Sequence, residues 1–222
     1  MDTNTTLLIM TNGRREYLER TLSTLGKLHG NFSRILIHDD SGDEDYHDWL
    51  KQLNYEIATT KRVGFTKAMI SAWQKLKEDS NEWVFHLEED FLLLDDIYVD
   101  TMIDVIKNHD YLKEMVLLRQ PIGNRSREQI KGGIIASHPE RYEDKTDGVN
   151  YWVEHRVGFS CNPCVYKKSL IYEYPWPDMP HSEREYGRVL FEDQNARCAY
   201  WGKSTDKPTA VHIGDVRSGF NY

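Results

Sequence analysis

An apolar run that ends in three consecutive acidic residues constrains the fold of this chain more than any other feature. Trp83-Val84-Phe85-His86-Leu87 has the length and composition of a buried β-strand, and Glu88, Glu89 and Asp90 follow where that strand would reach the surface. Open α/β sheets bind ligands outside the carboxyl ends of their strands, and carboxylate oxygens suit hard cations that share the phosphates of a nucleotide. The stretch therefore predicts a metal site at a sheet edge, although a solvated acidic strand end would give the same pattern.

Apolar and amphipathic segments alternate through the first half of the chain. Strand-like apolar segments occupy residues 6–10, 35–38, 55–59, 83–87 and 115–119. Helix-like segments occupy residues 16–28, 65–76 and 95–108. Strands that alternate with helices indicate parallel βαβ units, so this half predicts a Rossmann-like sheet flanked by helices.

The pattern becomes less regular after residue 119. Strand-like character returns at residues 151–159, 164–167 and 209–212, and residues 191–201 have a helical pattern that begins with two acids. Loops are expected at residues 121–133 and 137–150, and prolines exclude regular structure at residues 174–180. No linker divides the chain. We therefore expect a single α/β domain over residues 1–222, with a mostly parallel sheet in residues 1–118 and a smaller mixed region in residues 119–222.

Composition narrows the class of protein. The 36 acidic residues outnumber the 28 basic ones, and the resulting net charge of −8 disfavours binding of nucleic acid by bulk electrostatics, although a local basic groove remains compatible with it. No apolar run approaches the ~20 residues of a membrane span, and no secretion signal is recognisable. Cys161 and Cys164 have zinc-ligand spacing, but no second pair completes a tetrahedral site. Three cysteines fit reduced thiols, so we expect a cytoplasmic protein.

Polar residues also end the earlier strands of the predicted sheet. They are Thr11, Asn12 and Arg14 after the first strand, Asp39 and Asp40 after the second, and Gly64 and Lys67 before the helix at residues 65–76. A turn with an arginine at a helix N-terminus can hold a phosphate or a base edge, and the two acids can accept hydrogen bonds from a ribose or a base. A lysine in the first turn opposes the helix dipole, which favours a ligand-facing role. Ordinary capped turns would give each pattern separately, so only the combination is informative.

Taken in order, these motifs resemble those of GT-A glycosyltransferases, and are most similar to the family 2 enzymes. In that family a Thr/Asn/Arg turn ends the first strand, an Asp-Asp-Gly-Ser-like element ends the second, and a Gly-x-x-x-Ala helix start follows. Residues 11–14, Asp39-Asp40-Ser41-Gly42 and Gly64–Ala68 match these elements. The family's metal-binding Asp-x-Asp element ends the next core strand, where this chain has Glu88-Glu89-Asp90. Because a glutamate replaces the first aspartate, Asp90 is the expected metal ligand, helped by Glu88 or Glu89.

Two later motifs extend the resemblance toward the end of the chain. Phe191-Glu192-Asp193-Gln194 resembles the Glu-Asp motif that holds the catalytic base of inverting family members, with Arg197 and Gly202 in keeping with it. It implies that Asp193, or Glu192, is the base. His212 resembles the C-terminal histidine that completes the metal site in some GT-A enzymes. The match extends from Leu7 to about Gly214, although each motif is short.

The resemblance implies a metal-dependent, inverting glycosyltransferase. It would move a sugar from a nucleotide-diphosphate sugar, most simply a UDP-sugar, to an acceptor hydroxyl. Asp90 and His212 would hold Mn²⁺ or Mg²⁺ between the two phosphates. The nucleotide sugar is expected to contact Thr11, Asn12, Arg14, Asp39, Asp40, Gly64, Lys67, Glu88 and Glu89.

The sequence leaves the acceptor open among a glycan, a small molecule and a hydroxylated base in DNA. Four aromatic residues would suit stacking on a sugar or base, or else fill a core: Tyr151, Trp152, Trp176 and Tyr186. Four basic residues would suit a phosphate-bearing acceptor, or else form a solvated loop: Arg119, Arg125, Arg127 and Lys131. A nucleotidyltransferase, a retaining transferase and a non-catalytic nucleotide-sugar-binding protein stay as alternatives, and the oligomeric state is open.

Overall fold

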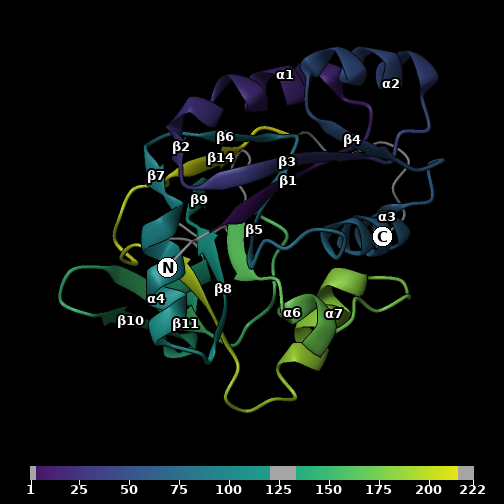
Figure 1. The fold of residues 1–222 in the computed structure, drawn as a ribbon. Coiled ribbons are helices and arrows are strands. Elements are labelled where there is room, and N and C mark those ends of the chain that lie inside the picture. Colours follow the sequence, from purple (N-terminus) through teal and green to yellow (C-terminus); the bar gives the residue numbers. More distant parts are fainter. Residues whose placement is uncertain (1–3, 121–133, 215–222) are drawn as a thin grey trace.

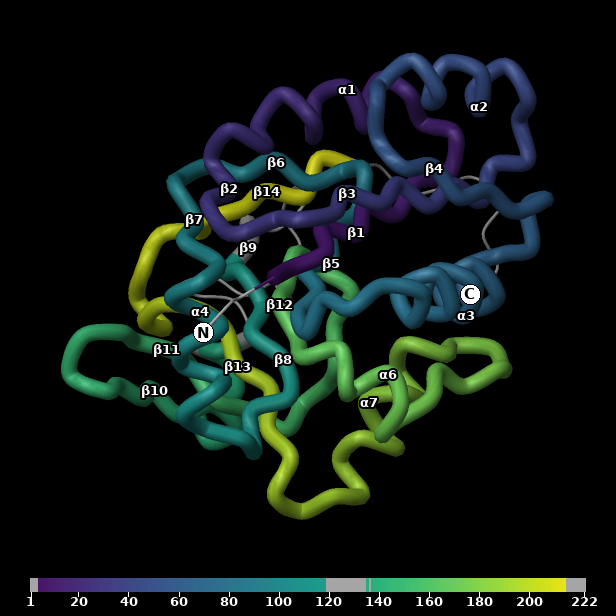
Figure 2. The backbone as a smooth tube through the Cα atoms, viewed as in Figure 1, coloured from purple at the N-terminus to yellow at the C-terminus, as the bar shows by residue number. Residues whose placement is uncertain are grey.

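A nine-stranded sheet with helices on both faces forms the body of the protein (Figures 1 and 2). The computed structural model describes residues 4–120 and 134–214. The spatial order of the strands is β10 (Tyr142–Thr146), β11 (Tyr151–His155), β13 (Arg197–Trp201), β8 (Leu112–Leu117), β12 (Cys164–Lys167), β5 (Trp83–Glu88), β1 (Thr5–Thr11), β3 (Phe32–Asp39) and β4 (Glu56–Thr59). All of these strands run in one direction except β11 and β12.

Helices cover the two faces of the sheet in separate groups (Figure 1). One buried cluster packs α1 (Arg15–Ser23), α2 (Glu44–Leu50) and α4 (Val99–Asn108) against one face, and a second packs α3 (Phe65–Leu76), α6 (Leu170–Glu173) and α7 (Ser182–Leu190) against the other. Side chains of β1 alternate between the clusters, as the two-residue period of a strand requires: Leu7 and Ile9 join the first, Leu8 and Met10 the second. The two faces are therefore buried, which explains the continuous apolar runs of the core strands.

Short elements complete the fold. A three-stranded sheet joins β6 (Phe91–Leu93), β14 (Ala210–His212) and β9 (Arg119–Gln120), and a two-stranded one joins β2 (Leu28–His29) and β7 (Ile97–Tyr98). The remaining helical segments are α5 (Ile134–Ser137) and three 3₁₀ turns at Leu25–Lys27, Lys51–Leu53 and Pro139–Arg141. Among the described residues no helix is both long and apolar enough to cross a membrane.

Register brings the polar ends of three core strands to one edge of the sheet. Thr11 of β1 lies opposite Asp39 of β3, and Met10 lies opposite Glu88 of β5. Because these strands are parallel, their carboxyl ends form a single edge, as the alternation of strands and helices predicted.

The sequence misplaced several elements in the second half. The helix expected at residues 191–201 is wrong: α7 occupies residues 182–190, and residues 197–201 form β13, hydrogen-bonded between β8 and β11. A short apolar run such as Cys198-Ala199-Tyr200 fits a buried helix or strand equally well by periodicity, and the neighbouring strands decide it. The loop expected at residues 137–150 contains β10, which pairs with β11. In the first half, α2 was not expected, because its apolar face is only Tyr46 and Leu50.

A carboxyl group lies inside the second cluster, beneath the sheet edge. Glu114 of β8 is fully buried, accepts a hydrogen bond from the backbone N–H of Ser160 at 3.3 Å, and also contacts the thiols of Cys164 and Cys198. Burial raises the pKa of Glu114 to about 8, so the folded protein holds it as a neutral acid at pH 7. The unfolded chain would ionise it at its ordinary value, near pH 4.5.

This difference predicts a loss of stability with rising pH. The folded state binds the extra proton between about pH 4.5 and 8, so unfolding releases it and the free energy of unfolding falls as pH rises through that range. Glu114→Gln should remove this fall, which is on the order of a few kcal/mol, because the amide is neutral throughout. Urea unfolding at pH 5 and pH 8 measures it. Glu140→Gln, at an exposed position, is the control and should keep the wild-type slope. An equal slope in Glu114→Gln would refute the neutral buried acid.

Candidate active site

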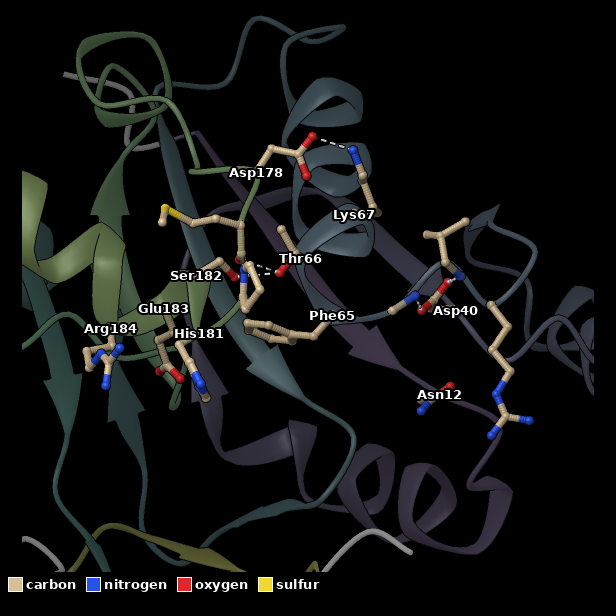
Figure 3. Close-up of a pocket in the computed structure, with 15 residues that line it drawn as sticks. Asn12, Asp40, Phe65, Thr66, Lys67, Asp178, His181, Ser182, Glu183 and Arg184 are labelled. Atoms are coloured by element: carbon tan, nitrogen blue, oxygen red, sulfur yellow. Dashed lines mark hydrogen bonds and ion pairs between the residues drawn. The ribbon is translucent and has the colours of Figure 1, made fainter. Parts of the chain in front are cut away.

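A cavity of about 740 Å³ opens at the carboxyl edge of the sheet (Figure 3). One wall consists of Asn12, after β1, and Asp40, after β3, together with residues 62–67 at the start of α3. The facing wall consists of residues 178–184, which lead into α7 and which we call the α7 wall. A small recess beside it is lined by Thr11 and Glu88 among others. The fold thus brings residues from both halves of the chain to one hollow.

Glu89 fixes the turn after β1. Its side chain is fully buried and accepts hydrogen bonds from the hydroxyl of Thr11, the backbone N–H of Asn12 at 3.0 Å and Nε of Arg14 at 2.6 Å. A buried carboxylate is stable only when it is paired and hydrogen-bonded, and this one is. Glu89 is therefore occupied in joining β5 to the first turn of the chain, rather than presented to the cavity.

The two aspartates after β3 fix the neighbouring turns in the same manner. Asp39 is fully buried and accepts from the backbone N–H groups of Gly13 at 3.2 Å and Ser41 at 2.9 Å, and it lies 2.8 Å from Nε2 of His47. Asp40 lines the cavity but accepts from the backbone N–H groups of Val63, at 2.7 Å, and Gly64, at 2.8 Å. Both carboxylates thus shape the backbone that surrounds a ligand.

Asp90 and His212 meet beside this edge. β14 pairs with β6 so that His212 lies opposite Phe91 and stacks on its ring, with centroids 4.6 Å apart. Nε2 of His212 is then 3.1 Å from Oδ2 of Asp90, and Nη2 of Arg14 is 2.6 Å from the same oxygen. Burial would raise the pKa of Asp90, but the hydrogen bond to His212 and the charges of His212 and Arg14 outweigh it and lower the pKa to about 2.

The donor atoms of this pair are of types that a divalent cation takes, and Nε2 of His212 is the ring nitrogen that faces Asp90. Oδ1 of Asp90 and Nδ1 of His212 are buried and have no hydrogen-bond partner among the described residues. Carboxylate oxygen and imidazole nitrogen both suit Mn²⁺, and a cation that also takes phosphate oxygens needs few protein ligands. Within residues 4–120 and 134–214, however, no group of three or more His, Cys, Asp or Glu side chains is arranged to hold a metal ion.

Two side-chain contacts lie on the far side of the cavity, between α3 and the α7 wall. Lys67, in the first turn of α3, forms an ion pair with Asp178, and the hydroxyl of Thr66 lies 2.9 Å from that of Ser182 (Figure 3). They attach the α7 wall to the helix that follows Gly64. Gly64 has φ +87°, a conformation that glycine adopts without strain, and its N–H faces Asp40.

Glu183 lies on the α7 wall and was not singled out from the sequence. It lines the cavity from the first turn of α7, and its Oε1 accepts the backbone N–H of Cys161 at 2.8 Å. Gly187, one turn further along the helix, packs directly on the same loop: a Cβ there would be 2.9 Å from the backbone nitrogen of Phe159. A signal was present, since acids follow Pro180 and precede the apolar residues Tyr186 and Leu190, which is the pattern of a helix start.

Solved structures of sugar transferases share this arrangement of elements. S. aureus TarS residues 1–349 in complex with UDP-GlcNAc aligns over 97% of this chain with a TM-score of 0.64 and 15% identity. GalNAc-T7 with UDP, GalNAc and Mn²⁺ aligns over 96% (TM-score 0.65, 12% identity), and the mannosyltransferase PcManGT from Pyrobaculum calidifontis with GDP-Man and Mn²⁺ over 98% (0.64, 11%). This chain has the GT-A fold.

The alignments cover only part of each of these solved chains. The GT-A chain described here covers 60% of the TarS chain, 44% of the GalNAc-T7 chain and 59% of the PcManGT chain. No protein-family model matches its sequence, and no curated protein matches it significantly. The GT-A fold expected from the sequence is confirmed, and membership of family 2 stays a prediction.

The GT-A fold also reveals where the expected base does not lie. Glu192 and Asp193 are in the turn between α7 and β13, and the backbone N–H of Arg197, just beyond them, bonds to Tyr111 before β8. They therefore stand at the amino edge of the sheet, whereas the cavity opens at the carboxyl edge. The five residues of β13 separate these edges by more than ~13 Å at about 3.3 Å per residue. Assigning the base to Asp193 or Glu192 depended on a helix that this part of the chain does not form.

The structure also bears on the aromatic and basic residues that the sequence offered as candidates for acceptor binding. Trp152, Trp176 and Tyr186 are buried in the two cores, so the stacking interpretation is wrong for them. Tyr151 is partly exposed, but Nζ of Lys203 lies 4.0 Å from the centre of its ring. The side chains of Arg119, Arg125, Arg127 and Lys131 lie outside the described residues.

The close contact at Gly187 yields a stability prediction. A methyl group at this position would overlap the backbone of residues 158–159, which cannot move aside as a flexible side chain would. Gly187→Ala should therefore lower the free energy of unfolding by about 1–3 kcal/mol. The midpoint of urea unfolding measures it. Gly26→Ala, where a Cβ meets nothing within 4 Å, is the control, and equal midpoints for the two variants would contradict the packing.

Proposed function

We propose that this protein transfers a sugar from a nucleotide-diphosphate sugar to an acceptor hydroxyl. The observation that carries the proposal is the cavity between the strand ends and the α7 wall, which combines hydrogen-bonding groups for a nucleotide with the carboxylate of Glu183. The fold supports it, because TarS was crystallised with UDP-GlcNAc and PcManGT with GDP-Man. A UDP-sugar is the donor that we favour. Residues 1–118 would bind the donor and residues 119–222 the acceptor.

The donor would occupy the wall formed by the strand ends. Asn12 and Asp40 lie where the nucleoside would sit, and Thr11 and Glu88 line the recess beside them. Arg14 and Lys67 are cations within reach of this wall and suit the diphosphate. Asp39 and Glu89 contribute indirectly, since their hydrogen bonds hold the turns in place.

Asp90 and His212 would hold Mn²⁺ or Mg²⁺, with Glu88 helping directly or through water. When bound, the cation neutralises charge that develops on the departing nucleoside diphosphate. Arg14 lies on the same carboxylate oxygen of Asp90 and adds a second positive charge on that side. Gly214 lies against the carboxylate of Asp90, and a side chain at this position would collide with that carboxylate.

Glu183 replaces Asp193 and Glu192 as the proposed base. Its Oε1 is held by Cys161, and the carboxylate faces the cavity, so it is placed to take the proton from an acceptor hydroxyl. The hydroxyl oxygen then attacks the anomeric carbon as the bond to the diphosphate breaks, and a single displacement inverts the configuration. The acceptor class within this scheme is a glycan, a small molecule or a hydroxylated base in DNA.

Replacement of Glu183 tests the base. Glu183→Gln keeps the shape and the hydrogen bond from Cys161 but removes the proton acceptor, so kcat should fall by about 10²- to 10⁴-fold with the KM for donor unchanged. Transfer of a radiolabelled sugar measures it. Asp193→Asn is the matched control and should keep the wild-type rate, since Asp193 lies at the other edge of the sheet. A large loss in Asp193→Asn, with Glu183→Gln active, would reverse the assignment.

Release of nucleoside diphosphate from UDP-, GDP-, ADP- and TDP-sugars tests the function itself. We expect slow hydrolysis of one donor, faster with Mn²⁺ or Mg²⁺ and abolished by chelator. Asp90→Ala should lose the metal stimulation, while Asp144→Ala, on the distant β10, should retain it. Failure of every donor to bind or turn over, with metal present, would refute the transferase.

A further inference from the structure

The α7 wall places a histidine and an arginine next to Glu183. His181 and Arg184 line the cavity together with Glu183, and all three belong to the start of α7. Figure 3 shows their side chains projecting toward the same side of this helix start. His181 is exposed, and the Arg184 side chain is 74% exposed. The proposed base is therefore flanked by two side chains that can donate hydrogen bonds to an anion.

On the facing wall, Lys67 is paired with Asp178, the carboxylate of Asp40 accepts backbone N–H groups, and Arg62 also lines the cavity. The α7 wall adds the guanidinium of Arg184 and the imidazole of His181, two groups that can donate hydrogen bonds to an anion, beside the carboxylate of Glu183.

The pairing of Arg184 along the helix does not account for its position. Its Nη2 lies 3.2 Å from Oε1 of Glu185, its sequence neighbour. Glu185 has a better partner in Arg188, whose Nε lies 2.8 Å from the other carboxylate oxygen. Exposed pairs of this kind contribute little to stability. The guanidinium of Arg184 therefore remains available for a bidentate contact with phosphate or carboxylate.

His181 has an uncommon backbone conformation at the start of α7. It precedes α7 in the left-handed region, with φ +56° and ψ +36°, and its side chain makes no capping hydrogen bond. Glycine or asparagine would adopt this conformation at lower cost, and serine, threonine or aspartate would cap the helix. The imidazole of His181 is therefore not used to cap α7, and its N–H is a donor that a ligand in the cavity can accept from.

We propose that the acceptor carries a phosphate or carboxylate next to its reactive hydroxyl, and that His181 and Arg184 bind this anionic group. The inference rests on the proposed function, since it assumes that the hydroxyl approaches Glu183. His181 and Arg184 would then set both the orientation of the acceptor and the choice among acceptors. A neutral acceptor would leave them unused.

Binding of inorganic phosphate tests the site without any donor. Phosphate is titrated by calorimetry at constant ionic strength, and acetate in parallel, against wild type and three variants. His181→Gly and Arg184→Ala should each weaken phosphate binding by about three- to tenfold. Arg188→Ala removes an equally exposed cation of the same helix that does not line the cavity, and should bind as wild type does. Equal affinity in all four proteins would overturn the proposal.

Thermal unfolding excludes a trivial cause. His181→Gly should not lower the melting temperature, because glycine relieves the left-handed backbone. A loss of phosphate affinity in a variant that is at least as stable as wild type then arises from the side chain. A loss of affinity that only follows a lowered melting temperature would count against the site.

Matched acceptors separate the chemical sources of the anion. Transfer from the donor identified by hydrolysis is compared between glycerol and glycerol 3-phosphate, and among glucose, glucose 6-phosphate and glucuronate. We expect the phosphate or the carboxylate member to accept sugar at least about tenfold faster than its neutral counterpart, with the preference lost in His181→Gly and Arg184→Ala. Equal transfer to neutral and charged members would refute the inference. Absence of donor turnover would refute the transferase instead, and the phosphate titration would still decide this site.

Discussion

The site depends first on the buried carboxylate of Glu89. It directly follows the central strand β5, yet its side-chain oxygens are used by the turn after the neighbouring strand β1, through Thr11, Asn12 and Arg14. The backbone oxygen of the same residue accepts the hydroxyl of Thr21 in α1. One charged residue therefore locks two strands and a helix into a fixed relation. Since a buried charge without its partners is very costly, this arrangement has few alternatives of similar energy.

Asp39 and Asp40 repeat the principle around the edge of the sheet. Each of these acids looks like a ligand-binding group in the sequence, and each accepts two backbone N–H groups as well as side-chain contacts within the protein. Buried carboxylates therefore fix the turns that line this edge of the sheet. Residue type and position at a strand end indicated the site correctly. They did not distinguish the acids that hold the turns in place from those that face the cavity.

Much of the fold follows from the sequence because the core strands are buried on both faces. The runs at β1, β3 and β5 and the amphipathic pattern of α3 leave little ambiguity, and their polar ends had to meet at one edge. The elements of the second half were harder to predict from the sequence. Residues 197–201 form a strand only because β8 and β11 flank them, and residues 182–190 carry too few apolar residues to stand out as a helix. Because of that error, the sequence indicated Asp193 as the base, whereas the structure leads us to propose Glu183.

The antiparallel strand β12 has a consequence for motion. It is hydrogen-bonded to β5 on one side and to β8 on the other, so the two halves of the chain share a single continuous sheet. Rotation of one half against the other would break rows of backbone hydrogen bonds, which excludes hinge closure of the kind seen in two-lobed enzymes. The segment between α6 and α7 has no strand pairing with the sheet and contacts α3 through Lys67–Asp178, through Thr66, and through the buried ring of Trp176. In the transferase that we propose, adjustment of the cavity to its ligands would therefore come from side chains and from this segment, since the sheet itself is continuous.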